Sequence, residues 1–146
     1  MYQTTRRVEF RDTDAAGIVH FSAFFPLMES VEHECLRAHG LTVMAPAENG
    51  TLVTWPRVAA ECQYYSPARF EDVLQISFGV QHLGTKSVRY RCTFAIAERL
   101  VARGMISAVC CCLHSHQLQS VVIPESMRAV LKTLLLAEST ENIGPG

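Results

Sequence analysis

Two carboxylates lie close together in a short polar stretch near the amino terminus, directly before a helical pattern. The stretch reads Asp12-Thr13-Asp14-Ala15-Ala16-Gly17-Ile18-Val19-His20-Phe21. The first turn of a helix presents backbone N–H groups without partners and a partial positive charge, which suit a substrate oxygen that becomes negative during a reaction. An acid a few residues upstream could then face a carbonyl group that these N–H groups polarise.

The same residues also allow a purely structural interpretation. Asp is a preferred turn residue because its side chain can bond to the backbone of its own turn, and Gly17 can supply the tight bend. In this interpretation Asp12 or Asp14 closes a turn and performs no chemistry. On local spacing alone, both interpretations remain open.

The cysteines and histidines near the carboxyl-terminal third offer a second kind of chemistry. Cys110, Cys112, His114 and His116 have a spacing of two, which would place them on one face of a strand. Alternate residues of a strand lie about 7 Å apart, so four of them cannot close a tetrahedron with ligand distances of about 2.0–2.3 Å. We expect no metal site, and we interpret the six cysteines as reduced thiols that pack as small apolar side chains.

A helix over about residues 22 to 38 follows the polar stretch. Its apolar residues recur at spacings of three and four, and they are Phe24, Leu27, Met28, Val31 and Cys35. Pro26 fits only in the first turn, and Gly40 is suited to ending the helix. Glu29, Glu32 and His33 fall between the apolar positions, so we expect Glu32 and His33 on the exposed face.

Alternation of apolar and polar residues predicts the strands of an antiparallel sheet. The expected strands cover about residues 4–10, 58–64, 74–81, 88–96 and 100–114, the last more apolar and expected to be buried on both faces. A short connection at Gly84-Thr85 predicts a hairpin, and a second helix is expected from Pro124. The element order indicates an α+β fold, with the antiparallel sheet wrapped around one long central helix. We expect one domain over residues 1–140 and a loose tail over 141–146.

Charge and hydropathy exclude several classes of function. The 146 residues carry a formal net charge of −1, which lacks the basic surface that a nucleic-acid-binding protein or a polybasic membrane anchor needs. No run of 18 apolar residues is present, and we recognise no secretory signal, so we expect a cytoplasmic protein without a membrane span. An anionic ligand would have to be held by a few local cations.

The sequence resembles the hotdog-fold acyl-CoA thioesterases of the 4-hydroxybenzoyl-CoA thioesterase type. The residues that carry the resemblance are DTDAAGIVHFSAFFPLMESVEHECLRAHGL, the strand entry at Trp55-Pro56, and YYSPARFEDVL. The resemblance extends from about Val8 to the final strand. It implies an antiparallel sheet around a long helix, and a homodimer or homotetramer with the active site at a subunit interface.

Specific roles follow from the resemblance. Asp14 matches the catalytic carboxylate of the family, which attacks the thioester carbonyl or activates water. Phe21 matches the position whose backbone N–H points at the thioester oxygen, and Gly17 would let the backbone approach closely. His20 would orient the substrate or Asp14, act on a proton, or simply pack. Glu29 matches the helix carboxylate that a second branch of hotdog thioesterases uses, and its alternative is an ordinary solvated position.

The resemblance also places the phosphates of CoA. Lys86 matches a basic position that contacts CoA in the family, and Arg89 and Arg91 follow it on the polar side of the strand. Both residue types are suitable phosphate partners, and a solvated strand face is the alternative for the two arginines. The chain departs from the family at Gly84 and Thr85, where relatives carry neighbouring basic residues.

The expected function is therefore hydrolysis of an acyl- or aroyl-CoA thioester to the free acid and CoA, without a metal or redox cofactor. One alternative is a hotdog hydratase or dehydratase, which uses an Asp and a His close in sequence, as Asp14 and His20 are here. Another is a non-catalytic acyl-CoA-binding module, because a fold alone does not guarantee activity. The acyl group itself is not legible in the sequence.

Overall fold

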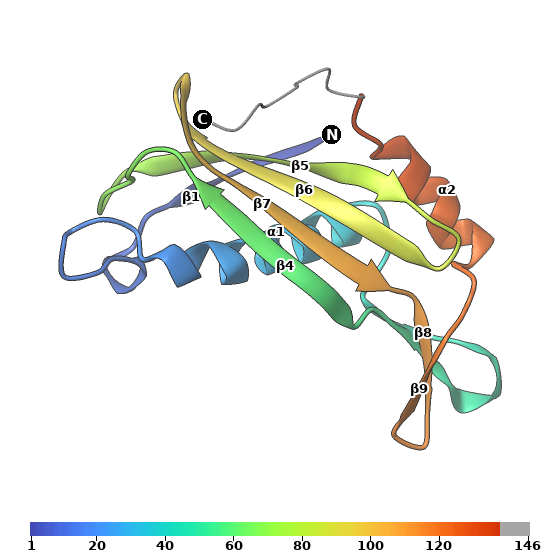
Figure 1. The fold of residues 1–146 in the computed structure, drawn as a ribbon. Coiled ribbons are helices and arrows are strands. Elements are labelled where there is room, and N and C mark those ends of the chain that lie inside the picture. Colours follow the sequence, from blue (N-terminus) through green and yellow to red (C-terminus); the bar gives the residue numbers. More distant parts are fainter. Residues whose placement is uncertain (138–146) are drawn as a thin grey trace.

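A five-stranded antiparallel sheet wraps around one long helix in the computed structural model, which describes residues 1–137 (Figure 1). The strand order is β1-β5-β6-β7-β4. The strands are β1 (Tyr2–Arg7), β5 (Val73–Leu83), β6 (Ser87–Ile96), β7 (Arg99–Val109) and β4 (Arg57–Tyr64), and the helix is α1 (Phe24–Ala38). This is the α+β arrangement expected from the sequence. The tail expected over 141–146 lies outside the described residues.

The apolar stripe of α1 forms the centre of the core. Phe24, Met28, Val31 and Cys35 are buried, as their spacing predicts. The helix ends in a Schellman motif, in which the N–H of Leu41 donates to the carbonyl of Leu36 at 2.8 Å. Pro26 lies in the first turn, where the absence of an N–H costs no hydrogen bond.

The concave face of the sheet packs onto this stripe. In β6, the buried residues Val88, Tyr90, Cys92 and Phe94 alternate with more exposed ones, which confirms the predicted period of two. Helix and sheet approach closely at Gly104 of β7, where a Cβ atom would overlap the Sδ atom of Met28. The absence of a side chain at this position therefore lets helix and sheet meet.

A second, four-stranded sheet extends from the end of β7, and sequence patterning did not predict it. Its order is β2-β3-β8-β9, with β2 (Met44–Pro46), β3 (Leu52–Thr54), β8 (Cys111–His114) and β9 (Gln117–Ser120). The expected strand over 100–114 is wrong in two ways. It breaks at Cys110, whose N–H donates to the carbonyl of Lys86 at 2.7 Å, and β7 alternates in burial instead of being buried on both faces.

This break also separates the cysteines and histidines of even spacing. Cys110 lies between the two strands, and His116 sits in the β8–β9 turn with φ of 66°. The expectation that they share one strand face is therefore wrong. Among residues 1–137, no group of three His, Cys, Asp or Glu side chains is arranged to hold a metal ion.

Two further boundaries differ from the prediction. The first strand ends at Arg7 instead of residue 10, because Phe10–Asp12 form a 3-10 turn that the carboxylate of Asp12 closes onto the N–H of Glu9 at 2.9 Å. Pro124 caps α2 (Glu125–Thr133) from outside instead of occupying its first helical position. In the part of the chain that the structure describes, no helix is long and apolar enough to cross a membrane.

Candidate active site

The stretch Asp12–Phe21 forms a tight turn between β1 and α1, and Asp14 is its central residue. The backbone N–H of Asp14 donates to the carbonyl of Ile18 at 2.9 Å, and the N–H of Gly17 donates to the carbonyl of Asp14 at 3.0 Å. Gly17 has φ of +77°, a conformation that a residue with a side chain rarely adopts. The backbone of the turn therefore requires glycine here.

The side chain of Asp14 takes part in the same turn. Its Oδ1 accepts hydrogen bonds from the N–H of Ala16 at 2.8 Å and of Ile18 at 3.4 Å. Its Oδ2 has no hydrogen-bond partner among residues 1–137. The turn interpretation of the sequence is thus confirmed for one oxygen of the half-buried carboxylate, and the turn does not use the other oxygen.

An apolar cavity of about 460 Å³ lies beside Asp14. Among the residues that the structure describes, Asp14 is the only charged one that lines it. The others come from the turn, from the start of α1 and from the end of β4 with its following loop, and they are Ile18, Val19, Phe21, Phe24, Tyr64, Tyr65, Ser66, Pro67 and Ala68. We call this space the Asp14 cavity. A carboxylate in such surroundings can act on a substrate whose remaining atoms are apolar.

Phe21, directly before the amino-terminal end of α1, lines the same cavity. It opens a 3-10 turn, Phe21–Ala23, that continues directly into α1. The first hydrogen bond of this turn runs from the N–H of Ala23 to the carbonyl of His20 at 2.9 Å, so the N–H of Phe21 precedes the helical ladder. The structure therefore brings together a carboxylate and a helix-start N–H, the two groups predicted from the sequence.

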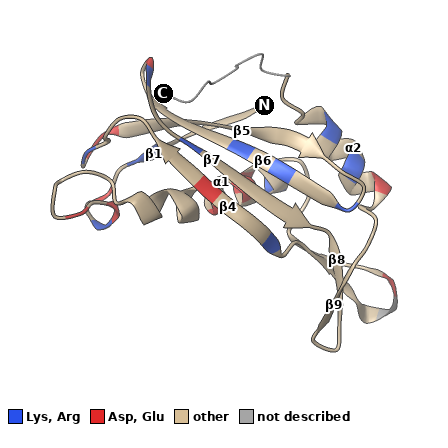
Figure 2. Ribbon diagram, in the orientation of Figure 1, with Lys and Arg blue, Asp and Glu red and all other residues tan. Residues whose placement is uncertain are grey.

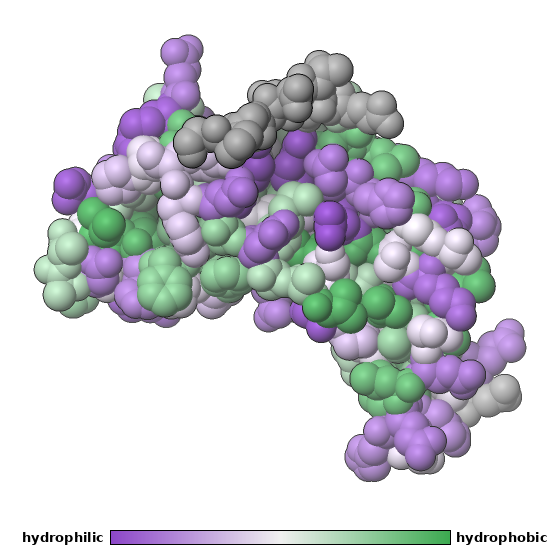
Figure 3. Space-filling view, viewed as in Figure 1, coloured by the Kyte–Doolittle hydropathy of each residue, from purple (hydrophilic) through white to green (hydrophobic). Residues whose placement is uncertain are grey.

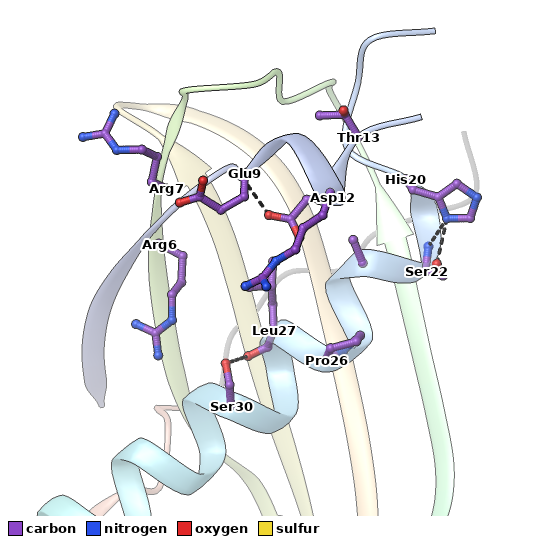
Figure 4. Close-up of a pocket in the computed structure, with 12 residues that line it drawn as sticks. Arg6, Arg7, Glu9, Asp12, Thr13, His20, Ser22, Pro26, Leu27 and Ser30 are labelled. Atoms are coloured by element: carbon purple, nitrogen blue, oxygen red, sulfur yellow. Dashed lines mark hydrogen bonds between the residues drawn. The ribbon is translucent and has the colours of Figure 1, made fainter. Parts of the chain in front are cut away.

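His20 faces away from this cavity. Its Nδ1 accepts a hydrogen bond from the N–H of Ser22 at 3.2 Å and lies 2.7 Å from the hydroxyl of Ser22, so the imidazole caps the 3-10 turn. Figure 4 shows the ring bonded to Ser22 at one end of a different, larger groove. The structure does not place His20 beside the carboxylate of Asp14 on the same cavity.

The larger groove has a volume of about 860 Å³ and lies between β1 and the first half of α1 (Figure 4). Arg6 and Arg7 line it, but both already have carboxylate partners. Arg6 forms an ion pair with Glu34, and Arg7 lies 3.7 Å from Glu71. A hydrogen bond from the hydroxyl of Tyr2, together with Arg6, lowers the pKa of Glu34 to about 2. These charges are largely matched within the protein.

The acidic residues of α1 occupy different environments. Glu29 is exposed and lines neither cavity. The expectation that Glu32 is exposed is wrong, because its side chain is only 1% exposed and pairs with Arg57 through contacts of 2.7 and 3.0 Å. Burial raises the pKa of Glu32 to about 7, and Arg57 partly opposes this. The burial of Glu32 could have been predicted from its spacing of four from Met28, which places the two residues on the same face of the helix.

His33 was also expected on the exposed face and is half-buried instead. Burial lowers the pKa of its imidazole.

Tyr64, Tyr65 and the loop Ser66–Ala68 were not predicted as site residues. They reach the cavity because β4 pairs with β7 and its end returns to the turn, where Ile18 forms a bridge with Arg69. The sequence predicted a strand over 58–64, but no local pattern indicated that the end of this strand would lie beside Asp14.

The expected CoA-binding residues lie far from Asp14 within one protomer. Lys86 is exposed in the β5–β6 turn, and Arg89, which is exposed, donates to the hydroxyl of Ser107 at 3.1 Å. Figure 2 shows positive charge along β6, the strand that contains Arg89 and Arg91. Arg91 lies on the same face as Arg89, as alternation predicts. The turn before α1 and the β5–β6 turn lie at opposite ends of the 11-residue strand β5, roughly 33 Å apart. Within this one chain, the fold does not bring Lys86 to Asp14.

Comparison with known proteins identifies the family. A protein-family model described as the thioesterase-like superfamily matches residues 8–131 of this chain. A 1,4-dihydroxy-2-naphthoyl-CoA hydrolase from Synechococcus elongatus is 27% identical over 127 residues, covering 87% of this chain and 92% of the relative.

Solved structures agree with the fold. A 1,4-dihydroxy-2-naphthoyl-CoA thioesterase from Synechocystis has a TM-score of 0.78 at 22% identity, covering 91% of this chain and 96% of the other. A gentisyl-coenzyme A thioesterase has a TM-score of 0.73 at 28% identity, covering 87% of this chain and 99% of the other. The hotdog architecture expected from the sequence is confirmed.

Proposed function

The chain belongs to the thioesterase-like superfamily, and from this membership we propose that it hydrolyses an acyl- or aroyl-CoA thioester to the free acid and CoA. The observation that carries the proposal is the Asp14 cavity. Asp14 supplies its carboxylate, Phe21 at the start of the helix lines the same space, and the other lining residues are apolar or uncharged. A thioester carbonyl bound there would meet both groups at once.

The proposed reaction needs only Asp14, the N–H of Phe21 and water. The N–H donates to the carbonyl oxygen and stabilises the negative charge that develops when the carbon is attacked. The carboxylate either attacks the carbonyl carbon, forming an anhydride that water then hydrolyses, or takes a proton from an attacking water molecule. In both routes the C–S bond breaks, and CoA leaves as a thiolate that is then protonated.

The cavity walls favour an aromatic acyl group. Among residues 1–137, four aromatic side chains line it, and they are Phe21, Phe24, Tyr64 and Tyr65. Aromatic rings stack or meet edge to face with additional stabilisation of about 0.5–1.5 kcal/mol per pair. Two of the relatives are named for hydrolysis of naphthoyl-CoA and gentisyl-CoA. We therefore place aroyl-CoA thioesters first among the substrates.

We further propose that the active unit is a dimer formed through β4. This strand is at the edge of the sheet, and Val58 on it is 64% exposed. Figure 3 shows apolar atoms among polar ones along the position of β4. An edge strand with free backbone groups and exposed apolar residues can pair with a second copy, which continues the sheet across both protomers.

Such a dimer supplies the missing phosphate contacts. Antiparallel pairing of two β4 strands sets Arg57 of one copy near Tyr64 of the other. Through β7, Arg57 aligns with Val88 at the hairpin end, whereas Tyr64 aligns with Phe94 at the Asp14 end. The hairpin of the partner subunit, with its Lys86 and Arg89, then lies at the Asp14 end, about three strand spacings or 15 Å across the sheet.

The position of His20 separates this proposal from the hydratase alternative. A hydratase of this fold needs an Asp and a His acting on one substrate, but His20 caps the 3-10 turn and lines the other groove. The Asp14 cavity is therefore better suited to thioester hydrolysis than to addition of water to a double bond.

The test is a panel of CoA esters assayed by release of free thiol. We expect kcat/KM to be higher for benzoyl-, hydroxybenzoyl- and naphthoyl-CoA than for acetyl- or palmitoyl-CoA. Tight binding of these esters without thiol release would instead indicate an acyl-CoA-binding module. Conversion of crotonyl-CoA to a 3-hydroxy product would indicate a hydratase.

A further inference from the structure

The hydroxyl of Tyr64 connects the edge strand β4 to the turn that precedes α1. It donates a hydrogen bond of 2.8 Å to the backbone carbonyl of Phe21, 43 residues earlier in the chain. The carbonyl and the N–H of Phe21 flank the same Cα atom. The two groups belong to adjacent peptide planes, so a contact that holds the carbonyl restricts the N–H through the φ and ψ angles of Phe21, which are those of a 3-10 turn.

The ring of Tyr64 is held by its neighbours. Its centroid lies 5.5 Å from that of Phe24, whose ring meets Phe94 edge to face at 5.2 Å. Phe94 is fully buried, so this chain of rings extends from the core to the Asp14 cavity. Burial raises the pKa of Tyr64 above its ordinary value of 10.0, so the hydroxyl remains a donor near neutral pH.

We propose that Tyr64 is a positioning residue for the thioesterase reaction, because its hydroxyl fixes the Phe21 turn with the N–H directed at the thioester oxygen. This inference rests on the proposed function. Donors that are already oriented stabilise a developing oxyanion without reorganisation during the reaction. A misplacement of about 1 Å can lower a rate on the order of 10²-fold, so a loosened turn lowers turnover more than binding.

The chain offers a matched control in Tyr2. Its hydroxyl donates to Oε1 of Glu34 at 2.6 Å and thereby connects β1 to α1, as that of Tyr64 connects β4 to the helix start. Tyr2 does not line the Asp14 cavity. Both Tyr64→Phe and Tyr2→Phe remove one hydroxyl and keep the ring, so each loses one hydrogen bond to the helix or its first turn.

The experiment measures kcat and KM on an aroyl-CoA for wild type, Tyr64→Phe and Tyr2→Phe, together with their melting temperatures. It also measures the Kd of an unreactive CoA thioether, which has no carbonyl oxygen. We expect Tyr64→Phe to lower kcat about tenfold, a part of the loss typical for removing an oxyanion donor. KM and the thioether Kd should change less than about twofold, and Tyr2→Phe should keep kcat within about twofold.

Three results would overturn this inference alone: wild-type kcat in Tyr64→Phe, an equal loss of kcat in Tyr2→Phe, or a thioether Kd that weakens as much as kcat falls. The last result would make Tyr64 an ordinary part of the pocket wall. A wild-type chain that hydrolyses no ester would overturn the proposed function first, and this inference with it.

Discussion

The side chain of Asp14 both closes a turn and lines the cavity in which we propose that the reaction takes place. Hydrogen bonds from Ala16 and Ile18 hold one carboxylate oxygen in the turn, and the side chain lines an apolar cavity. The sequence presented these as competing interpretations, but the geometry makes them compatible. A carboxylate fixed by its own turn loses little conformational freedom when a substrate binds, which is an advantage for a reacting group.

The ionisation of Glu32 makes stability depend on pH between about 4.5 and 7. Its pKa is raised from 4.5 to about 7. Between these values the folded protein keeps a proton that the unfolded chain loses, so the free energy of unfolding falls as pH rises through this range. Glu32→Gln removes this dependence. We therefore expect the variant to gain stability relative to wild type as pH rises from 5 to 8, measured by urea unfolding.

The difference between variant and wild type isolates Glu32 from its neighbour His33. The lowered pKa of His33 gives the opposite slope, because the unfolded chain then binds more protons below pH 6.5. This slope is present in both proteins and cancels in the difference. If wild type gained stability over Glu32→Gln with rising pH, the ion pair with Arg57 would outweigh burial, and the stated direction of the pKa shift would be wrong.

At the scale of elements, the contact between α1 and β7 sets how closely helix and sheet approach. A Cβ atom at Gly104 would overlap Sδ of Met28, which is fully buried. Gly104→Ala should therefore lower the free energy of unfolding by about 1–3 kcal/mol through overpacking. Urea unfolding of the variant measures this loss.

A double-mutant cycle provides the control for this contact. In a Met28→Ala background the space is open, so the added methyl group of Gly104→Ala should cost less or restore part of the lost packing. Equal costs in both backgrounds would show that the two residues do not compete for space.

The elements differed in how far the sequence could predict them. Helix α1 and the β5–β6 hairpin were predicted because each buries one face against the core, and that face imposes a period on the sequence. The second sheet was missed because its strands have only three or four residues, too few to show a period. The apolar run through Cys110 then read as one long strand, since composition alone does not mark a bend.

The candidate site was predictable only where its residues are neighbours in sequence. Asp14, Gly17 and Phe21 lie within eight residues of one another, between β1 and α1, so a local pattern and the family resemblance could both point to them. Tyr64 reaches the same cavity through strand pairing, which depends on contacts across the whole sheet. Lys86 illustrates the converse, because the family resemblance implied a binding residue while the fold places it at the far end of the protomer.

At the scale of the whole molecule, the proposed dimer through β4 predicts that a variant that cannot dimerise also binds CoA esters less well. Val58→Lys places a charge on the exposed edge, which opposes strand pairing between copies. We expect this variant to be monomeric by light scattering. Its KM for CoA esters should rise about tenfold or more, because Lys86 and Arg89 of the partner subunit no longer reach the phosphates.

Val122→Lys is the control, since Val122 is 58% exposed but lies outside β4. It should retain the oligomeric state and KM of wild type. A dimeric Val58→Lys protein, or a monomer with unchanged KM, would contradict the assignment of β4 as the interface that completes the site.

The central claim, that the carboxylate of Asp14 carries out thioester hydrolysis, is tested most directly by free-thiol release from the best aroyl-CoA. Asp14→Asn is compared with wild type and with Asp12→Asn, whose side chain only closes the preceding turn onto the N–H of Glu9. We predict that Asp14→Asn retains the melting temperature within a few degrees and loses kcat by at least about 10²-fold, while Asp12→Asn retains wild-type turnover. Wild-type turnover by folded Asp14→Asn would contradict the account.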